Sequence, residues 1–464
     1  MSLIGKYKKV FTVILSTLFY VYVAYFLERT KFLELLFCWS FLFGSFYFLT
    51  KKNDLSFKNL ALISIFFRLI FLFATPNLSQ DFYRFIWDGR MLLEGYNPYL
   101  SIPENFIKQS VSPINEAKTL YEGMGILNGS HFTNYPPILQ FCFFITAFFS
   151  NKSIFGSIII FRIIIILADI GILYYGKKLL ERVELPVKNI FWYVLNPFII
   201  IEMTGNLHFE PVMLLFLIIG LNHLHQQKWF FAGIFMGLAV SVKLIPLLFL
   251  PLIFQNFKKT KNSTKLNFKI YFLSRFKTID FVKLIFFYIV IFTTTVLLFS
   301  PFLSQNFIVN YSKTVGLWFT TFEFNASFYY LFREIGYLFR GYNEIAIIGK
   351  ITAICTIIFI ATLAIFKNNK SFKKLIVSMI FGISFYYFFS STVHPWYVAT
   401  PLLLGVFTKY KFPIIWTFVV ILSYQAYTNS LSKENLWLIA LEYVLLYSYI
   451  IYEIKKHITK KMIC

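Results

Sequence analysis

The chain has 464 residues, of which 58% are apolar and only 14% are charged, whereas a soluble domain is typically about 45–50% apolar and about 25% charged. This composition excludes an ordinary soluble enzyme. The net charge of +23 would suggest a nucleic-acid partner in a soluble protein. Here the Lys and Arg residues lie in short segments between apolar runs, as the positive-inside rule describes. We therefore expect a lipid bilayer, and no nucleic acid, as the partner of this surface.

The first three apolar runs predict three membrane helices, because a span needs about 20 residues; they lie near 10–27, 32–50 and 59–75. The first run follows a basic segment and has no small-residue cleavage site before Glu28, which predicts an uncleaved first span. The lysines after the second run place that loop in the cytoplasm. The third helix would then end on the far side, so the long polar stretch at about 76–135 is predicted to be extracytoplasmic.

Later apolar runs predict further crossings near 154–175, 189–204, 207–224, 229–255, 281–303, 342–366, 373–390, 395–409, 412–428 and 434–453. Residues 136–150 are apolar but short and begin with two prolines, so we expect an interfacial or re-entrant segment there. The run at 229–255 is interrupted by Lys243 and Pro246, which predicts two short helices. The sequence thus predicts one all-α polytopic membrane domain over residues 1–464, with about 12–14 transmembrane helices.

Basic segments agree on which side of the membrane each loop lies. By the positive-inside rule, five of these segments are predicted to be cytoplasmic: 176–188, 256–280, 367–374, 408–411 and 455–461.

The densest group of charged residues follows the third predicted helix, in SQDFYRFIWDGRMLLEGYNPY at 79–99. If this segment is helical, Asp81, Arg84 and Asp88 share one face, with Arg90 on a neighbouring face. One interpretation is an interfacial amphipathic helix, in which the helix dipole stabilises the Asp81 carboxylate and lowers its pKa. The other is a carboxylate beside a phosphate-binding arginine. The spacing alone does not choose between them.

Two further polar groups lie at the predicted outer face. In HFTNYPP at 131–137, the prolines stiffen the chain as it re-enters the membrane and Tyr135 suits an interfacial belt. In NLHFEP at 206–211, His208 and Glu210 are costly in an apolar context unless they pair or face a cavity, which indicates a function. Two such groups do not make a metal site. The four cysteines show no metal or redox spacing either.

Lys243 lies within the apolar run GLAVSVKLIPLLFLP. It either extends its amine to the interface along an apolar stem or, beside the helix break that Pro246 predicts, binds a phosphate.

The segment STVHPWY at 391–397 places His394 and Trp396 between two runs, as an interfacial anchor or as a stacking platform for a lipid or a sugar. Trp318 and the segment FEFNAS at 322–327 form a candidate lid over the outer face. For Glu442, within the last run, the pattern indicates no role.

Together, and in this order, six motifs resemble those of the bacterial polyprenol-phosphate-mannose-dependent mannosyltransferases of the GT-C superfamily. They are SQDFYRFIWDGRMLLEGYNPY, NYPPILQ, LNPFIIIEMTGNLHFEPVMLL, GLAVSVKLIPLLFLP, STVHPWY and LEY. The first and fifth are the most specific. The resemblance implies a multi-pass protein of the bacterial inner membrane with an extracytoplasmic active site. It also implies a polyprenyl-phosphate sugar as donor and a glycan or lipid-linked acceptor.

On that resemblance, Asp81 matches the catalytic acidic position, where related chains often have two adjacent acids. Gln80 precedes Asp81 here, so a paired-acid metal site has no support, and no cofactor is predicted. The cations available to hold the donor phosphate are Arg84, Arg90 and Lys243. The residues expected to contact the sugar or the acceptor are Tyr135, His208, Glu210, His394 and Trp396.

The chemistry agrees with this assignment. A polyprenyl phosphate is a good leaving group, so the transfer needs one base on the acceptor hydroxyl rather than the two carboxyl groups of a glycosidase. We therefore expect an inverting transferase that moves a hexose, mannose by default. The alternative is a transporter or flippase of lipid-linked sugars, but that would favour internal repeats and binding groups at mid-depth. An acyltransferase would require a His–Asp pair.

Overall fold

The computed structural model describes residues 3–51, 54–257, 279–429 and 433–463. Within these ranges the regular structure is helical apart from isolated bridges, one of which joins Phe324 and Thr392. The predicted all-α polytopic class is confirmed. The predicted basic loop at 256–280 lies almost entirely outside the described residues.

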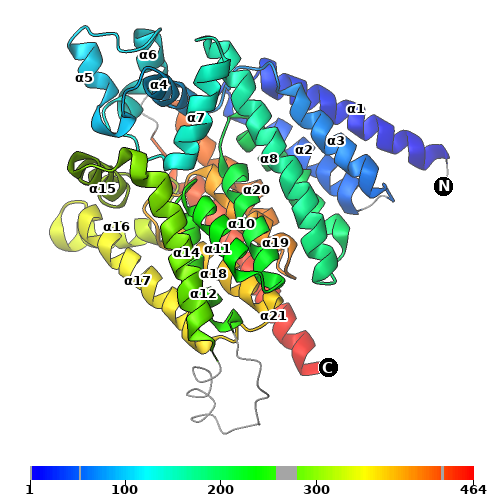
Figure 1. The fold of residues 1–464 in the computed structure, drawn as a ribbon. Helices are drawn as coiled ribbons and strands as arrows, with labels where there is room; N and C mark the ends of the chain where they lie inside the picture. Colours follow the sequence, from blue (N-terminus) through cyan, green and yellow to red (C-terminus); the bar gives the residue numbers. More distant parts are fainter. Residues whose placement is uncertain (1–2, 52–53, 258–278, 430–432, 464) are drawn as a thin grey trace.

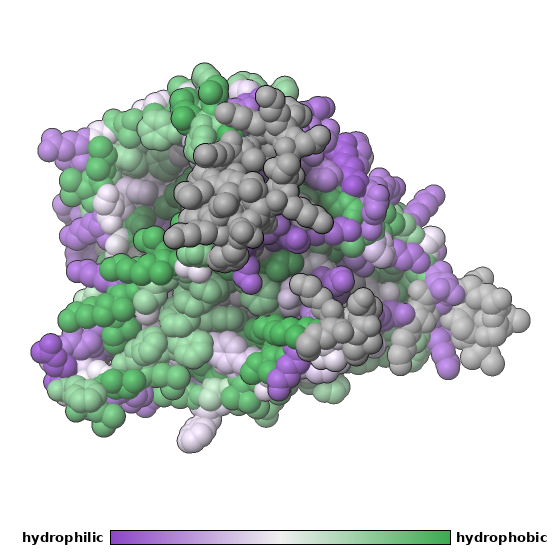
Figure 2. All heavy atoms as spheres, turned by 90° about the horizontal axis from the view of Figure 1, so that it is seen from below, coloured by the Kyte–Doolittle hydropathy of each residue, from purple (hydrophilic) through white to green (hydrophobic). Residues whose placement is uncertain are grey.

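Seven of the described helices are long and apolar enough to cross a membrane, or eight spans if one bent pair is counted. They are α1 (Leu3–Tyr25), α2 (Phe32–Lys51), α8 (Ile154–Arg182), α14 (Phe281–Phe299), α17 (Ile345–Phe366), α18 (Phe372–Phe389) and α21 (Leu436–Ile463). Eighteen residues cover roughly 27 Å, close to the ~30 Å of a hydrocarbon core. Large apolar side chains such as Phe292 and Ile357 are exposed, and hydrophobic areas spread widely over the face drawn in Figure 2. The chain is a multi-pass integral membrane protein.

Several predicted crossings are shorter helices: α3 (Phe57–Ile70), α11 (Trp229–Val240), α19 (Ala399–Val406) and α20 (Phe412–Val419). The predicted interfacial or re-entrant segment at 136–150 is the short helix α7 (Pro137–Phe149). With 13 residues, α7 reaches roughly 20 Å and is too short to cross, as the sequence predicts. The 229–255 run divides into α11 and the short helices η4 (Ile245–Phe249) and α12 (Leu250–Ile253). Prolines without an amide hydrogen start both short helices.

The predicted spans at 189–204 and 207–224 form one broken element. A π-helix, η3 (Ile199–Gly205), meets α10 (Glu210–His225) at an angle of 111°. At the break, Leu207 has a φ of 63°, in the left-handed region of backbone conformation that residues other than glycine rarely adopt. The break turns the chain sharply and presents the residues between the two helices to the interior.

One buried arginine of α8 holds this break. The guanidinium of Arg162 donates to Thr204 O at 2.9 Å and to Gly205 O at 3.0 Å, the last carbonyls of η3. It also donates to Leu72 O at 3.0 Å and Ala74 O at 2.7 Å, just after α3. Carbonyls at helix ends have no partner within their own helix, so this one side chain satisfies two such ends at once.

A buried ion pair also joins α3 to α8. Arg68 Nε of α3 lies 2.8 Å from Asp169 Oδ2 of α8, and both side chains are 1% exposed. Arg68 Nη1 also donates to Val194 O of α9 (Phe191–Val194) at 2.7 Å. The bundle around the broken element is therefore fixed by hydrogen-bonded arginines as well as by apolar packing.

Short helices cover one end of the bundle. They are α4 (Asp81–Leu93), α5 (Pro103–Lys108) and α6 (Ala117–Gly129), at the top of Figure 1, with α15 (Gln305–Thr320) and α16 (Phe328–Arg340) beside them. The C-terminal end of α21 lies at the bottom of the same view. The predicted outer stretch at 76–135 and the predicted cytoplasmic tail thus lie at opposite ends of the molecule.

This arrangement generates a test of sidedness. In a cysteine-free background, a Lys118→Cys variant of α6 should react with a membrane-impermeant maleimide added outside intact cells, because this side chain is 82% exposed. A Lys455→Cys variant, exposed near the end of α21, should react only after the membrane is opened. Labelling of both from one side would contradict the predicted topology.

Candidate active site

Asp81 is the first residue of α4, and its carboxylate is held by α6. Asp81 Oδ1 accepts a hydrogen bond from Asn128 Nδ2 at 3.1 Å. Burial raises the pKa of Asp81 above its usual value, although the hydrogen bond from Asn128 and two nearby cations act in the opposite direction. The lowered pKa expected from the helix dipole is therefore not what this environment produces. A carboxylate with a raised pKa is a stronger base.

Lys243 and Glu210 form an ion pair beside this carboxylate. Lys243 follows the end of α11, and Glu210 is the first residue of α10, directly after the break. The Glu210 side chain is 2% exposed and that of Lys243 is 20% exposed. Both interact electrostatically with Asp81. Three residues far apart in the sequence thus meet at one place, and Lys243 has its charged partner within the protein instead of reaching for the interface.

Three aromatic rings form a stack next to the pair. The rings of His208 and Trp396 have centroids 3.8 Å apart, and those of Trp396 and His394 are 4.5 Å apart. Burial, aided by the nearby Lys243, lowers the pKa of His394 to about 3, so this imidazole is neutral at physiological pH. Both faces of the Trp396 ring are covered. Stacking of a sugar on either face would require one imidazole to move.

Tyr135 joins the outer segment to the start of α7. Its ring meets Phe85 edge-on, with centroids 5.1 Å apart, and packs against Phe143. Its carbonyl accepts a hydrogen bond from the Tyr99 hydroxyl at 2.5 Å. The side chain interacts electrostatically with Asp81. Tyr135 therefore lies near Asp81, and its contact with the sugar or the acceptor stays a prediction.

Arg84 is paired within the protein. Its Nε donates to Asp88 Oδ1 at 2.9 Å, and the two side chains are 4% and 0% exposed. Its Nη1 donates to the carbonyls of Asn128 at 2.5 Å and His131 at 2.9 Å. The segment that carries Asp81, Arg84 and Asp88 is thus a helix, as predicted. However, the Asp88 carboxylate neutralises the charge of Arg84. A role on the donor phosphate stays an untested prediction.

Arg90 lies away from this group. Nine residues along α4 from Asp81 correspond to roughly 13 Å. Its guanidinium donates to Asn115 O at 2.7 Å and Lys152 O at 2.5 Å, and pairs with Glu116 at 3.0 Å. These contacts hold two loops together, and the structure does not bring Arg90 to the Asp81 carboxylate.

Arg29, which the sequence analysis missed, lies in the turn between α1 and α2. Its Cζ is 3.4 Å from the centroid of the Tyr427 ring, a cation–π contact. Its positive charge interacts electrostatically with the carboxyl groups of Asp81 and Glu202. Its Nε has no hydrogen-bond partner among the described residues, and no carboxylate among them forms an ion pair with it. The turn between the first two predicted spans lies across the membrane from the predicted cytoplasmic loop after the second span. An arginine there departs from the positive-inside rule, and this departure could have marked Arg29 as a candidate.

Glu202 was missed as well, although an acidic residue within an apolar run is a functional candidate. It is fully buried in η3 and accepts a hydrogen bond from the Tyr424 hydroxyl at 2.6 Å. Its Oε2 lies 3.8 Å from His208 Nε2. Glu202 therefore lies beside one end of the ring stack, at a distance too long for a hydrogen bond. Among the described residues, no three His, Cys, Asp or Glu side chains group to hold a metal ion.

A cleft adjoins the group, with about 440 Å³ of empty space that is partly open to solvent. It is lined by Arg84, Leu127, Asn128, His131, Phe132, Thr133, Asn134, Tyr135, Thr314, Leu317 and Phe322. Because Asn128 both lines the cleft and donates to Asp81, the cleft borders the carboxylate.

A membrane-helix bundle with a buried carboxylate and cations at one end is the architecture expected of a membrane glycosyltransferase. A model of the family described as alpha-(1->6)-mannopyranosyltransferase, N-terminal domain, matches residues 7–257, more than half of the chain. The chain belongs to this family. Asp81, Glu210 and Lys243 lie within the matched residues, whereas His394 and Trp396 lie beyond them.

The chain is also similar to alpha-(1->6)-mannopyranosyltransferase A of Corynebacterium glutamicum. The two are 28% identical over 193 residues, which is 39% of this chain and 35% of that relative. The match therefore spans about a third of the relative's length.

The contacts of Arg84 generate a stability prediction. Arg84→Met would leave the Asp88 carboxylate buried without its counter-charge, a loss typically worth about 3–5 kcal/mol. The thermal unfolding temperature of the detergent-solubilised protein should fall clearly. Removing both charges, as Arg84→Met with Asp88→Leu, should restore much of the loss. An unchanged unfolding temperature in the single variant would show that the Arg84–Asp88 ion pair does not stabilise the fold.

Proposed function

We propose that this protein transfers a mannosyl group from a polyprenyl-phosphate donor to an acceptor hydroxyl at the extracytoplasmic face of the membrane, with inversion at the anomeric carbon. The observation that carries the proposal is the partly buried Asp81 carboxylate within electrostatic reach of Lys243 and Arg29, in a membrane protein of this mannosyltransferase family. A donor with a polyprenyl tail needs a site that opens to lipid, and a helix bundle within the bilayer supplies one.

The reaction requires one base and a site for a leaving anion. The acceptor oxygen forms the new bond to the anomeric carbon while the bond from that carbon to the phosphate oxygen breaks. Asp81 takes the acceptor proton, and the polyprenyl phosphate departs with the electron pair. The raised pKa of Asp81 suits this task, because a base works best when its pKa approaches the working pH.

Lys243 and Arg29 are assigned to the departing phosphate, since cations placed where negative charge develops stabilise the transition state. Glu210 holds the Lys243 amine in position through their ion pair. The Arg29 guanidinium is positioned by the Tyr427 ring and has no carboxylate partner among the described residues, which leaves it available to an anionic ligand. Arg84 and Arg90, by contrast, already have protein partners.

The assignment of the base is tested by Asp81→Asn. The amide keeps the size of the side chain and an oxygen that can accept from Asn128, so donor binding should persist. Turnover should fall about 10²- to 10⁴-fold, the usual contribution of a general base. In the native protein the rate should also decline as the pH falls through a pKa above that of an ordinary Asp, because the protonated carboxyl cannot accept the proton.

The measurement is the transfer of radiolabelled mannose from polyprenyl phosphate, together with thermal unfolding of the same variant. If Asp81 only stabilises the helix N-terminus, the variant should lose about 0.3–1 kcal/mol of stability and keep its turnover. That pair of results would remove Asp81 from the mechanism.

The assignment of the phosphate site is tested by Arg29→Met. Loss of a charge-assisted hydrogen bond costs about 1.5–3 kcal/mol, so the donor KM should rise about 10- to 150-fold, with Arg29→Lys in between. The matched control is Lys31→Met in the same turn, because Lys31 is 44% exposed and lies 4.0 Å from Glu28. Equal donor KM values in Arg29→Met and in the control would contradict this role.

A further inference from the structure

The cleft beside Asp81 has two walls of different chemistry. One wall is the segment from Asn128 to Tyr135, whose side chains include amides and a threonine hydroxyl. The other consists of Thr314 and Leu317 of α15, and of Phe322. The first wall is held by Arg84, which donates to two carbonyls of that segment. The shape of the polar wall is therefore set by a buried arginine rather than left to a free loop.

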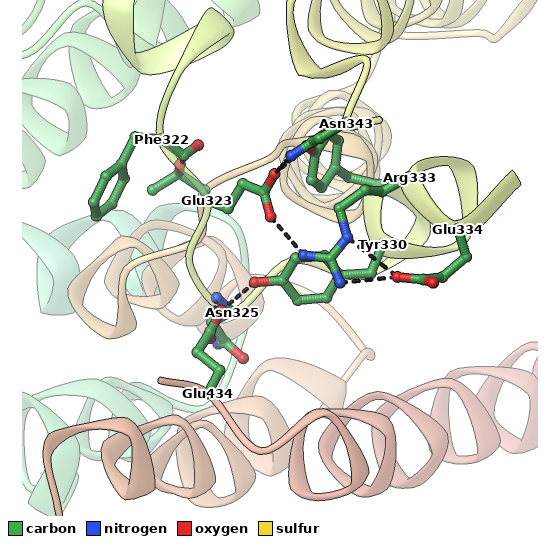
Figure 3. Close-up of polar contacts among 10 residues, drawn as sticks. Phe322, Glu323, Asn325, Tyr330, Arg333, Glu334, Asn343 and Glu434 are labelled. Atoms are coloured by element: carbon green, nitrogen blue, oxygen red, sulfur yellow. Dashed lines mark hydrogen bonds and ion pairs between the residues drawn. The ribbon is translucent and has the colours of Figure 1, made fainter. Parts of the chain in front are cut away.

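The second wall is held from behind. Residues 322–324 form a short non-helical segment in which Phe324 forms the bridge with Thr392, and Asn325, with a φ of 48°, ends it. Successive side chains of an extended segment point to opposite sides. Phe322 and Phe324 accordingly both approach the His394 ring, with centroids 5.8 and 5.4 Å away. Glu323 points the other way, as Figure 3 shows.

A polar cluster fixes the back of this segment (Figure 3). Glu323 accepts from Arg333 Nη1 at 2.6 Å and from the Tyr329 hydroxyl at 2.6 Å. Glu434 accepts from the backbone amide of Asn325 at 2.6 Å and from Tyr330. These contacts join α16 and the start of the last helix to the segment, so the Phe322 ring is held in position at the cleft. The candidate lid at 322–327 stays a prediction, and the Trp318 side chain lies outside the described residues.

The lining chemistry suits an uncharged, hydroxyl-rich ligand. Arg84 is the cation of the lining, and its charge is already matched by Asp88, so an anionic ligand would find no unpaired positive charge there. The Asn134 carboxamide is partly exposed in the lining and has no hydrogen bond among the described residues. Amides that donate and accept, next to aromatic rings, match the hydroxyls and the apolar face of a sugar ring.

We propose that this cleft is the acceptor subsite, in which a sugar ring of a glycan acceptor lies between Asn134 and Phe322 with its hydroxyl directed toward Asp81. The inference rests on the proposed function, which supplies the transfer. The cleft is partly open to solvent, which lets a longer glycan chain continue outside.

The experiment measures sugar binding without donor, by saturation-transfer NMR on the full-length protein in detergent. The probes are α-1,6-linked mannotriose and octyl α-mannoside. Asn134→Ala removes about one hydrogen bond, and Phe322→Leu removes the ring, so each should weaken binding about 2- to 12-fold. The matched control is Asn115→Ala, because this side chain is exposed outside the cleft and Arg90 contacts only its carbonyl. Unfolding temperatures verify that each variant is folded.

Weaker binding in both cleft variants, with native binding in the control, would support the subsite. Binding of both probes points to recognition of the sugar itself, and binding of octyl α-mannoside alone points to a lipid-linked acceptor; each is consistent with the subsite. Equal binding in all variants, or no binding of either probe to the native protein, would overturn it. If sugar binds in the cleft but labelled mannose is never transferred, the proposed function fails while the subsite stands.

Discussion

The site depends on a helix that is broken inside the bundle and on the arginine that satisfies the broken ends. An interrupted helix exposes carbonyls with no partner, and within a membrane each such group costs several kcal/mol. Arg162 donates to two carbonyls of η3 and to two after α3, so it makes the 111° bend compatible with burial. Without that bend, Glu210 could not open α10 beside Lys243, and His208 could not reach the Trp396 ring.

Half-length helices complete the arrangement by ending where the site lies. The amide of Ile138, at the start of α7, donates to Ser241 O, after the end of α11, at 3.0 Å. One helix start thereby satisfies one helix end, two residues before Lys243. Short apolar helices thus bring a lysine into the interior, and the Glu210 carboxylate neutralises it there. A bundle of full-length spans would have no interior helix ends from which to present these groups.

The sequence predicted the fold class, the non-crossing α7 and the divided 229–255 run, because hydrophobic length and proline act locally. It also singled out Glu210, Lys243 and His208 as candidates, since polar groups in apolar runs are rare, and Asp81 through the dense group of charges around it and the resemblance of its motif. It did not reveal which arginine is already paired. Arg84 pairs with Asp88 one turn along its own helix, whereas its other partners and those of Arg90 lie in loops folded back from elsewhere. Arg29 approaches Asp81 through tertiary packing alone.

The balance at Asp81 explains why the base and the cations belong together. Burial alone disfavours the charged carboxylate and raises the pKa, and with enough burial the group would stay protonated and could accept no proton. Nearby cations and the Asn128 amide favour the charged form and counteract part of that rise. The net effect is a pKa above that of an ordinary Asp, with burial as its largest cause. In the proposed reaction the same cations would stabilise the departing phosphate, so one set of charges would serve both ends of the transfer.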